Sequence, residues 1–530
     1  MIANKKSILA LSIASALMLS GCFSDDDNNV VITPPPEPTD PVVVAPEVPA
    51  ELSFVVNGAV INDADSNVVD ATVKFLENGA PSTSIVNANG EQVQELQTGE
   101  EGGFVITRKD GSNTESVTAV VSADGFVTKS FIIDLANADG VKVVNVELAL
   151  LEIGKVGIAA DTGEGAVANG DTGAEIEASA TSGDNAVATA TLPQGTALKD
   201  KNGEAVEGAT ATLSVVGVEA DSTSKGQILP EGLNANADTQ VDVPVSVADI
   251  NLLVGSTAVK SFENGELNVT LAAPDLTGVD AGDLSVSSFD TDTGNWMADD
   301  FAVTKNVDGT VSFNTDHLTF FAVTRKQAIC ANPVAANITG TVPTGGLVFT
   351  AVSSDGAFSA PLPPGTATRE FISAANAKRY GIAADASARI KVRDREGGVW
   401  FETQNEVAIC AEDPIAITLT APFTLVDKQL TLNGVCANDR NVSVDLSNST
   451  VKYKRAGKGV RTALKDANGN FQLTNLREGE TYQVSINFRG VPVTTANTFE
   501  LDSVNADDLA RTFEVTCPTT TGSTGTTGGN

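Results

Sequence analysis

Residues Ser116–Val121 have the sequence SVTAVV, in which apolar residues recur at every second position. Successive side chains of a β-strand point to opposite faces, so this alternation places Val117, Ala119 and Val121 on one face. Residues 71–75 (ATVKF) alternate in the same way, and the Asn/Asp-rich residues 62–67 predict a turn between strands. These patterns predict a sheet with one buried face.

The composition of the whole chain extends this prediction. Aromatic residues make up 5% of the 530 residues, and Val, Thr, Ala, Gly and Asn are plentiful, without long periodic Leu/Glu/Lys segments. Such a chain favours many short strands joined by Gly, Asn and Asp turns. Three tyrosines and two tryptophans cannot supply the aromatic girdles of a transmembrane barrel. We therefore expect an all-β protein with several tandem β-sandwich domains.

The charge of the chain excludes one class of partner. There are 68 acidic and 33 basic residues, which gives a net charge of -35. Nucleic acid is not an expected partner, because phosphate binding needs a basic face. Anionic lipid surfaces are disfavoured for the same reason, and the acidic surface is interpreted as a solvated exterior rather than a store of divalent cations.

Four cysteines follow the N-terminal region: Cys330, Cys410, Cys436 and Cys517. An even number of cysteines in an exported protein indicates disulfides, and four allow three pairings. The intervals 330–410 and 436–517 are nearly equal, which favours two successive modules, each bridged from its first strand to its last. A zinc site is the alternative, but the chain has no Cys-x-x-Cys pair and a single histidine.

The N-terminal sequence contains a localisation signal. Lys5 and Lys6 precede an apolar run over residues 8–19 that is too short to span a bilayer, and Leu19-Ser20-Gly21-Cys22 resembles the lipobox of bacterial lipoproteins. The resemblance implies a cleaved signal and a lipid on Cys22. A secretory signal with an incidental cysteine is the alternative reading.

The residues after Cys22 indicate to which membrane the lipoprotein is sorted. Phe23 and Ser24 stand where this family places an inner-membrane retention aspartate, so the outer membrane is favoured. The acidic residues 25–27 occur in surface-displayed lipoproteins and equally suit a solvated linker. We expect a surface-exposed protein, with the periplasmic face as the alternative.

The modules resemble known sandwiches. The order of residues 56–60 (VNGAV), 69–73, 103–104 and 123–126 is similar to the carboxypeptidase regulatory-like, transthyretin-like sandwich. Residues 355–365 and 466–479 share a layout of two glycine turns around a short strand, which resembles regulatory-like or collagen-adhesin B-type sandwiches. The resemblance implies Ig-like accessory domains without catalytic residues.

These features divide the chain into seven parts. The expected parts are a signal peptide (1–21), a lipidated cysteine with a disordered Pro-rich linker (22–51), a regulatory-like sandwich (52–151), a larger β-rich domain (152–327), two disulfide-bridged sandwiches (328–418 and 419–517) and a disordered tail (518–530).

Three places suggest ligands. Asp63, Asp65 and Asn67 have the spacing that opens an EF-hand loop, but Val68 replaces its glycine and Lys74 its final glutamate, so a plain turn is favoured over calcium. Trp296 and Trp400 are candidates for stacking on a ligand such as a sugar, although burial against a sheet suits Trp296 better. His317, beside a Phe-Phe strand, is interpreted as structural.

Enzyme motifs are missing from the sequence. One histidine limits proton-transfer chemistry, and no Gly-x-Ser-x-Gly elbow, Walker motif or dinucleotide motif occurs. We expect a non-catalytic, cofactor-free, lipid-anchored rod of modules on the outer membrane that binds carbohydrate or protein. The alternative is a structural spacer or an envelope-assembly partner that binds no glycan.

Overall fold

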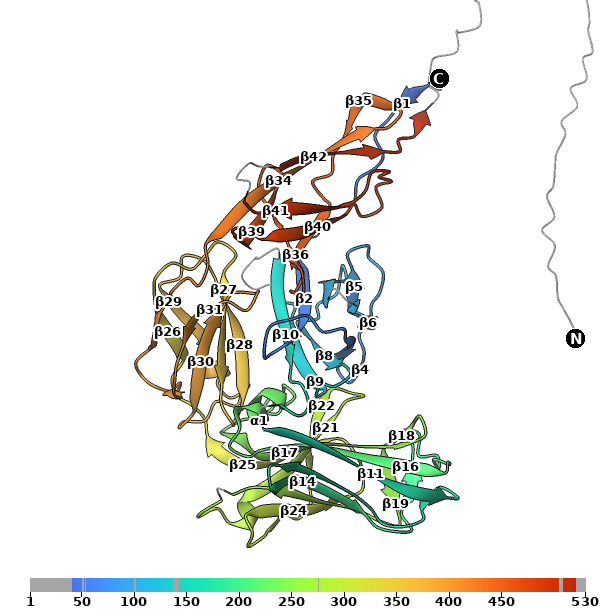
Figure 1. Cartoon of the computed structure of the whole chain (residues 1–530), viewed down its shortest axis with the longest axis vertical. Helices are drawn as coiled ribbons and strands as arrows, with labels where there is room; N and C mark the ends of the chain where they lie inside the picture. The colour runs from blue at the N-terminus through green and yellow to red at the C-terminus, as the bar shows by residue number, and fades with distance from the viewer. Residues whose placement is uncertain are drawn as a thin grey trace, which may run out of the picture. The chain divides into compact units, whose positions relative to one another are not determined.

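The computed structural model describes residues 41–49, 52, 54–99, 102–136, 143–155, 157–274, 276–504 and 509–520. Their regular secondary structure is almost entirely β-strand, as the alternating patterns predicted (Figure 1). The signal peptide, Cys22, most of the Pro-rich linker and most of the tail lie outside the described residues. Residues 43–518 form one compact unit, and its sheets pair into four sandwiches.

The first sandwich packs one sheet in the order β10-β2-β7-β5 against a second in the order β4-β3-β8-β9, with β6 on β3. Ser116–Val121 lies in β8, and Val117, Ala119 and Val121 all belong to the buried core. Its strands are β2 (Val55–Asn62), β3 (Thr72–Glu77), β4 (Ala80–Pro81), β5 (Ile85–Asn87), β6 (Glu95–Gln97), β7 (Gly103–Arg108), β8 (Ser116–Ser122), β9 (Lys129–Asp134) and β10 (Val143–Leu150).

The second sandwich is the largest. A ten-stranded sheet, ordered β19-β15-β12-β11-β16-β17-β25-β21-β22 with β18 on β17, faces a five-stranded sheet ordered β13-β14-β20-β24-β23. The short helix α1 (Thr223–Ile228) follows β16 and contacts β17. A 3-10 turn covers Ala281–Asp283.

The strands of the second sandwich are β11 (Ile158–Ala168), β12 (Asp171–Thr172), β13 (Ile176–Ser182), β14 (Asn185–Leu192), β15 (Ala197–Lys199), β16 (Thr210–Val218), β17 (Gln240–Val254), β18 (Thr257–Val259), β19 (Ser261–Glu263), β20 (Leu267–Ala272), β21 (Leu284–Asp290), β22 (Asn295–Asp299), β23 (Thr304–Lys305), β24 (Thr310–Thr315) and β25 (Phe320–Ala328).

The third sandwich places the sheet β29-β26-β33 against the sheet β28-β27-β30-β31, with β32 on β30. Phe349 and Ile390 are fully buried between the sheets. Its strands are β26 (Val334–Thr339), β27 (Leu347–Val352), β28 (Ala357–Leu362), β29 (Thr368–Ile372), β30 (Ser387–Arg393), β31 (Val399–Glu402), β32 (Val407–Ala408) and β33 (Ile415–Thr418), with a 3-10 turn at Ala374–Asn376.

The fourth sandwich places the sheet β35-β34-β39-β38, with β42 on β34, against the sheet β37-β36-β40-β41. Its strands are β34 (Leu425–Cys436), β35 (Asp439–Val444), β36 (Thr450–Arg455), β37 (Arg461–Thr462), β38 (Leu464–Lys465), β39 (Phe471–Arg477), β40 (Thr481–Asn487), β41 (Thr498–Asp502) and β42 (Leu509–Val515). β1 (Val42–Val43) and β43 (Thr519–Thr520) form a two-stranded sheet.

The last described residues of the Pro-rich linker contact the fourth sandwich rather than the first. Val43 packs against the core of the fourth sandwich, and the amide of Val44 donates to the carbonyl of Pro518 at 3.0 Å. Asn448 donates to the carbonyl of Pro49 at 3.0 Å. The two ends of the 43–518 unit therefore lie side by side.

The first, third and fourth sandwiches share one topological feature: the first strand pairs in parallel with the last. The pairs are β2 with β10, β26 with β33 and β34 with β42. In the last two pairs a disulfide links matching ends of the parallel strands, Cys330–Cys410 and Cys436–Cys517. The matching ends of two parallel strands lie at the same edge of the sheet, so one disulfide can join them. The two bridges close loops of nearly equal length, with sequence separations of 80 and 81 residues.

We predict that removing the second bridge destabilises the protein. Each bridge closes a loop of about 80 residues in the unfolded chain, which corresponds to about 4 to 5 kcal/mol on the loop-entropy model. The double variant Cys436→Ser with Cys517→Ser is expected to lose about this much free energy of unfolding in urea titrations. Peptide mapping without reductant checks the pairing directly, and a Cys330–Cys436 peptide would contradict it.

Candidate functional site

A tight turn at residues 393–398, between β30 and β31, is the point where three sandwiches meet. The Asp394 carboxylate accepts the backbone amides of Glu396 and Gly398, each at 2.9 Å, and its other oxygen accepts Trp400 Nε1 at 3.4 Å. Gly397 has a φ of 83°, which a side chain would strain. A Cβ on Gly398 would lie 2.3 Å from Asp394 Oδ2. The turn is therefore rigidly shaped and directs Glu396 to one side.

Glu396 extends from this turn into the fourth sandwich, where its buried carboxylate meets three guanidiniums. Oε1 accepts Arg461 Nη2 at 2.7 Å and the Tyr482 hydroxyl at 2.9 Å. Oε2 accepts Arg455 Nε at 2.8 Å and lies 3.2 Å from Arg477 Nε. The Glu396 side chain is 4% exposed. A desolvated carboxylate with three hydrogen bonds and a further ion pair is strongly held, because charge-assisted hydrogen bonds strengthen in a low dielectric.

The arginines of this cluster are also held by their own sandwich. Arg461 Nη1 donates to the carbonyls of Thr474 and Asn475 at 3.1 and 3.2 Å, and its guanidinium lies 4.5 Å from the centroid of the Tyr453 ring. Burial and the nearby Glu396 charge raise the pKa of Tyr482 to about 12, so it remains a hydrogen-bond donor. The three arginines and Tyr482 are thus held in position to bind one carboxylate.

Arg393 and Arg395, on the same turn, contact the first sandwich. Arg393 Nη2 lies 2.7 Å from Oε2 of Glu147 in β10, and Arg395 Nη1 lies 3.6 Å from Oε1. Arg395 Nη2 also donates to the Asn145 carbonyl at 3.3 Å. Glu147 and Arg393 are both buried. A six-residue turn therefore joins the third sandwich to the fourth through Glu396 and to the first through its arginines.

The first and fourth sandwiches also contact each other. Asn57, which is 2% exposed, donates to the Val460 carbonyl at 3.0 Å and accepts the Thr462 hydroxyl at 2.9 Å. β2 of the first sandwich therefore contacts the fourth sandwich, the module that lies farthest from it in sequence. The buried hydrogen bonds of Asn57 thus hold together two modules that are not neighbours in the sequence.

The proposed calcium loop belongs to this contact. Asp65 accepts the amide of Asn67 at 2.9 Å in the expected turn, and Lys458 Nζ donates to the Asp65 carbonyl at 2.9 Å and to Asn67 Oδ1 at 2.8 Å. Asp63 accepts Gln227 Nε2 at 2.9 Å. No group of three or more His, Cys, Asp or Glu residues suited to a metal occurs in the described part of the chain. An ammonium group thus takes the position that a bound cation would need.

Trp296 lies where the first and second sandwiches meet. Its Nε1 donates to the Pro230 carbonyl at 3.2 Å, and its ring packs at 5.5 Å from Phe289 and 6.0 Å from Phe320. Val127 of the first sandwich belongs to the same apolar cluster. Trp296 is therefore partly buried among these neighbours, and the structure gives it a packing role.

Two other candidates are also internal. Trp400 is 7% exposed in the core of the third sandwich, where it supports Asp394. Its rings are covered, which corrects the expectation that it stacks on a ligand from the surface. His317 packs near Phe301 and Phe321, and its Nδ1 lies 3.0 Å from Asp316 Oδ1, as expected for a structural histidine.

A buried pair of opposite charge strengthens the contact between the first and second sandwiches. Lys129 Nζ donates to the Gln227 carbonyl, and Glu231 accepts the Ile132 amide at 2.7 Å. Burial lowers the pKa of Lys129 and raises the pKa of Glu231, while their mutual attraction opposes both changes. The two residues come from different sandwiches, so this pair acts across the contact.

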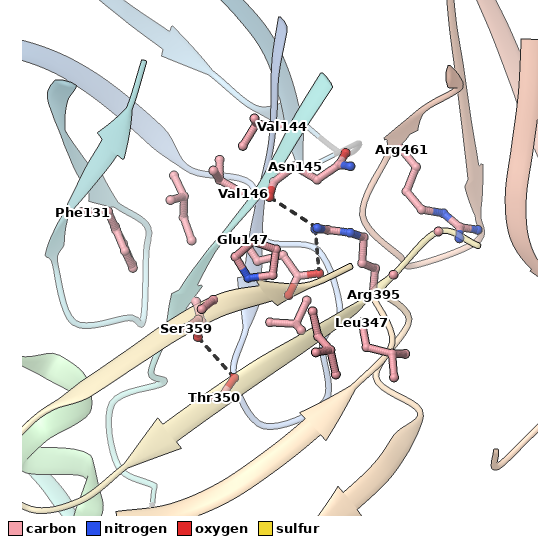
Figure 2. A pocket seen from close by; sticks show the side chains of 18 of the residues that line it. Phe131, Val144, Asn145, Val146, Glu147, Leu347, Thr350, Ser359, Arg395 and Arg461 are labelled. Carbon is pink, nitrogen blue, oxygen red and sulfur yellow. Dashed lines mark hydrogen bonds and ion pairs between the residues drawn. The ribbon is translucent and has the colours of Figure 1, made fainter. Parts of the chain in front are cut away.

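A cavity of about 690 Å³ opens beside the turn (Figure 2). The edge strands β9 and β10 of the first sandwich and the strands β27 and β28 of the third line most of it, and the fourth sandwich closes one end. Phe131, Val144, Val146 and Leu347 provide apolar walls, and Arg395 points into the space toward Glu147 (Figure 2). This volume and lining are typical of small-molecule sites.

Sequence reasoning missed the residues 393–398 and the three arginines that surround Glu396, which are Arg455, Arg461 and Arg477. The available signal is the run Arg-Asp-Arg-Glu-Gly-Gly between two strands, since alternating charges before paired glycines mark a tight turn. That run does not indicate which residues of the first and fourth sandwiches the turn contacts.

No family model and no curated protein matches this sequence. Among solved structures, the Bacillus anthracis TIE protein is 11% identical, with 69% of this chain and 59% of that chain covered and a TM-score of 0.15. The match thus spans less than two thirds of the TIE chain.

Two further solved structures are those of a pilin and of part of a collagen-binding protein. The full-length major pilin SpaD of Corynebacterium diphtheriae is 8% identical over 88% of this chain and 98% of that one, with a TM-score of 0.14. Two B repeats of the Staphylococcus aureus collagen-binding protein are 11% identical over 88% and 100%, with a TM-score of 0.13. Scores this low carry no argument about the function of this chain.

The variant Glu396→Gln is predicted to lower the free energy of unfolding by about 3 to 5 kcal/mol, because it leaves buried guanidiniums without their anion. Urea unfolding measures the change. The matched control is Glu514→Gln, which removes the partner of the exposed Arg440 and is expected to change stability by less than about 1 kcal/mol. Equal effects of the two variants would contradict the assigned role of Glu396.

Calcium is predicted to leave the protein unchanged. Lys458 already donates to the Asp65 backbone carbonyl and to Asn67 Oδ1, and the carboxylates of Asp65 and Asp63 accept hydrogen bonds from Asn67 and Gln227, so the oxygen atoms of this loop are already paired within the protein. Thermal unfolding in millimolar Ca²⁺ and in EDTA should give the same Tm. A calcium-dependent increase that disappears in Asp65→Asn would show that the loop binds the ion.

Proposed function

We propose that this chain is a non-catalytic, lipid-anchored protein of the bacterial outer membrane that presents β-sandwich modules in a fixed arrangement for binding to a protein or carbohydrate. One observation carries the proposal: buried polar contacts join the third sandwich to the fourth through Glu396, and they join the first sandwich to the third through Glu147 and to the fourth through Asn57. Such contacts suit a presenting scaffold, because a preorganised surface loses less conformational entropy on binding.

The anchor and the compartment are proposed from the N-terminal sequence. The Leu19–Cys22 lipobox resemblance supports a lipid on Cys22, and Phe23-Ser24 supports sorting to the outer membrane. The disulfides Cys330–Cys410 and Cys436–Cys517 support an oxidising compartment outside the cytoplasm. In the part of the chain that the structure describes, no helix has the length and apolar character to span a membrane.

A structural spacer or envelope-assembly partner is the second candidate. The positions of the tryptophans favour it over glycan binding: Trp400 is a core residue, and Trp296 fills a contact between sandwiches. A glycan site would then need other aromatic side chains. Among the described residues, Tyr380 and Phe423 are large aromatic side chains that are 53% and 42% exposed, and the Arg477 guanidinium lies 3.8 Å from the centroid of the Phe423 ring.

Replacement of the lipidated cysteine tests the anchor. In cells that make Cys22→Ser, the protein is expected to move from the membrane fraction to the soluble fraction, because its acyl chains are lost. Mass spectrometry of the wild-type N-terminal peptide should show acyl mass on Cys22. Unmodified Cys22 in a membrane-bound protein would contradict the anchor.

Protease treatment of intact cells tests the outward orientation. Surface display predicts that an added protease degrades the wild-type protein while a periplasmic marker survives. Complete protection until the outer membrane is permeabilised would place the modules in the periplasm and contradict the surface assignment.

A further inference from the structure

The cavity between the first and third sandwiches contains a guanidinium with little pairing from the protein. Arg395 has its carboxylate neighbour, Glu147 Oε1, at 3.6 Å and its carbonyl acceptor, Asn145, at 3.3 Å, both long for charged partners. Glu147 is also committed to Arg393 at 2.7 Å. One carboxylate thus serves two guanidiniums, and the cavity retains positive charge at Arg395.

A second arginine lines the same cavity. The Nε atom of Arg369, in β29, is buried and has no hydrogen-bond partner, and no ion pair joins its guanidinium to any of the described residues. A buried donor without an acceptor is costly and rare in native proteins. Arg369 and Arg395 therefore place two guanidiniums in the lining of one space.

The rest of the cavity wall combines apolar side chains with charged groups that have partners within the protein, namely Asp63, Lys129, Asp134, Glu231 and Arg461. Phe131 and Val144 belong to the first sandwich, and Leu347 and Phe358 to the third. Ser359 and Thr350 bond each other at 3.2 Å across β27 and β28, which satisfies their hydroxyls without a ligand. A molecule in this space would meet apolar groups along its body and guanidiniums at its head.

We propose that the cavity binds a small amphipathic anion, whose acidic head pairs with Arg395 and Arg369 and whose apolar body lies against the walls of β9, β10, β27 and β28. A planar guanidinium binds carboxylates and sulfates through paired hydrogen bonds, so both head groups share the required chemistry. A neutral molecule of the same shape leaves the guanidiniums unpaired, and a cation is repelled. The net charge of -35 does not prevent entry, because salt screens distant charges beyond about 8 Å.

Calorimetric titration of the full mature chain tests this site with four probes of equal chain length: decanoate, decyl sulfate, 1-decanol and decyltrimethylammonium. At least one anion is expected to bind with one equivalent per chain, and the alcohol and the ammonium at least tenfold more weakly. Comparison of decanoate with decyl sulfate identifies the preferred head group. Equal binding of 1-decanol, or no binding of either anion, would overturn the proposal.

Two variants locate the binding. Arg395→Met is expected to weaken binding of the anion at least tenfold, whereas Arg440→Met, at an exposed arginine, leaves it unchanged. Ser359→Trp fills the cavity from an exposed strand position and should abolish binding even if Arg395→Met does not fold. Its control is Ser443→Trp on β35, another exposed strand position. Anion binding that survives Ser359→Trp would overturn the proposal.

This inference is independent of the proposed anchor and surface function. Loss of anion binding in the Arg395 and Ser359 variants would leave membrane attachment intact. A failure of the Cys22 or protease experiments would likewise leave the titration results unaffected, so the two sets of outcomes are distinguishable.

Discussion

The arrangement of the modules depends on satisfying the buried charge of Glu396. A carboxylate withdrawn from water loses several kcal/mol of solvation unless donors surround it, and here the donors come from a different sandwich. Three arginines and Tyr482 meet both oxygens, so the third and fourth sandwiches gain this compensation only when they are docked. The same constraint applies to the guanidiniums, which would be buried without an anion if the turn moved away. The contact between the third and fourth sandwiches is therefore specific, because the carboxylate and the guanidiniums each need the other as a partner.

The surrounding structure serves to place that carboxylate. Asp394 fixes the turn by accepting two backbone amides, and Trp400 holds Asp394 from within the core. Because the turn continues β30 and β31, its position is set by the apolar core of the third sandwich. On the other side, Arg393 pairs with Glu147 of β10 and extends the contact to the first sandwich. Hydrophobic packing thus positions a small polar network, and the network defines which modules meet.

Local sequence patterns predicted the β-strands of this protein, but they did not predict which residues from distant parts of the sequence these strands and turns contact. The alternation at Ser116–Val121 identified a strand with the correct buried face, because period two is a property of the local backbone. The cysteine intervals anticipated the bridges, since matching ends of parallel first and last strands lie near each other. Lys458, by contrast, lies 391 residues from Asn67 in sequence, and nothing in either segment indicates the other. Trp400 resembled a surface aromatic for the same reason: its burial depends on strands that pack around it.

The central claim is that the sandwiches form one fixed body held by the Glu396 cluster. The most direct test is the distribution of distances between spin labels at the exposed positions Asp110, in the first sandwich, and Glu478, in the fourth. Pulsed dipolar spectroscopy should give one narrow distribution in the wild-type protein and a broad one when Glu396→Gln is added. A distribution that is already broad in the wild-type protein, or that is unchanged by the substitution, would contradict the claim.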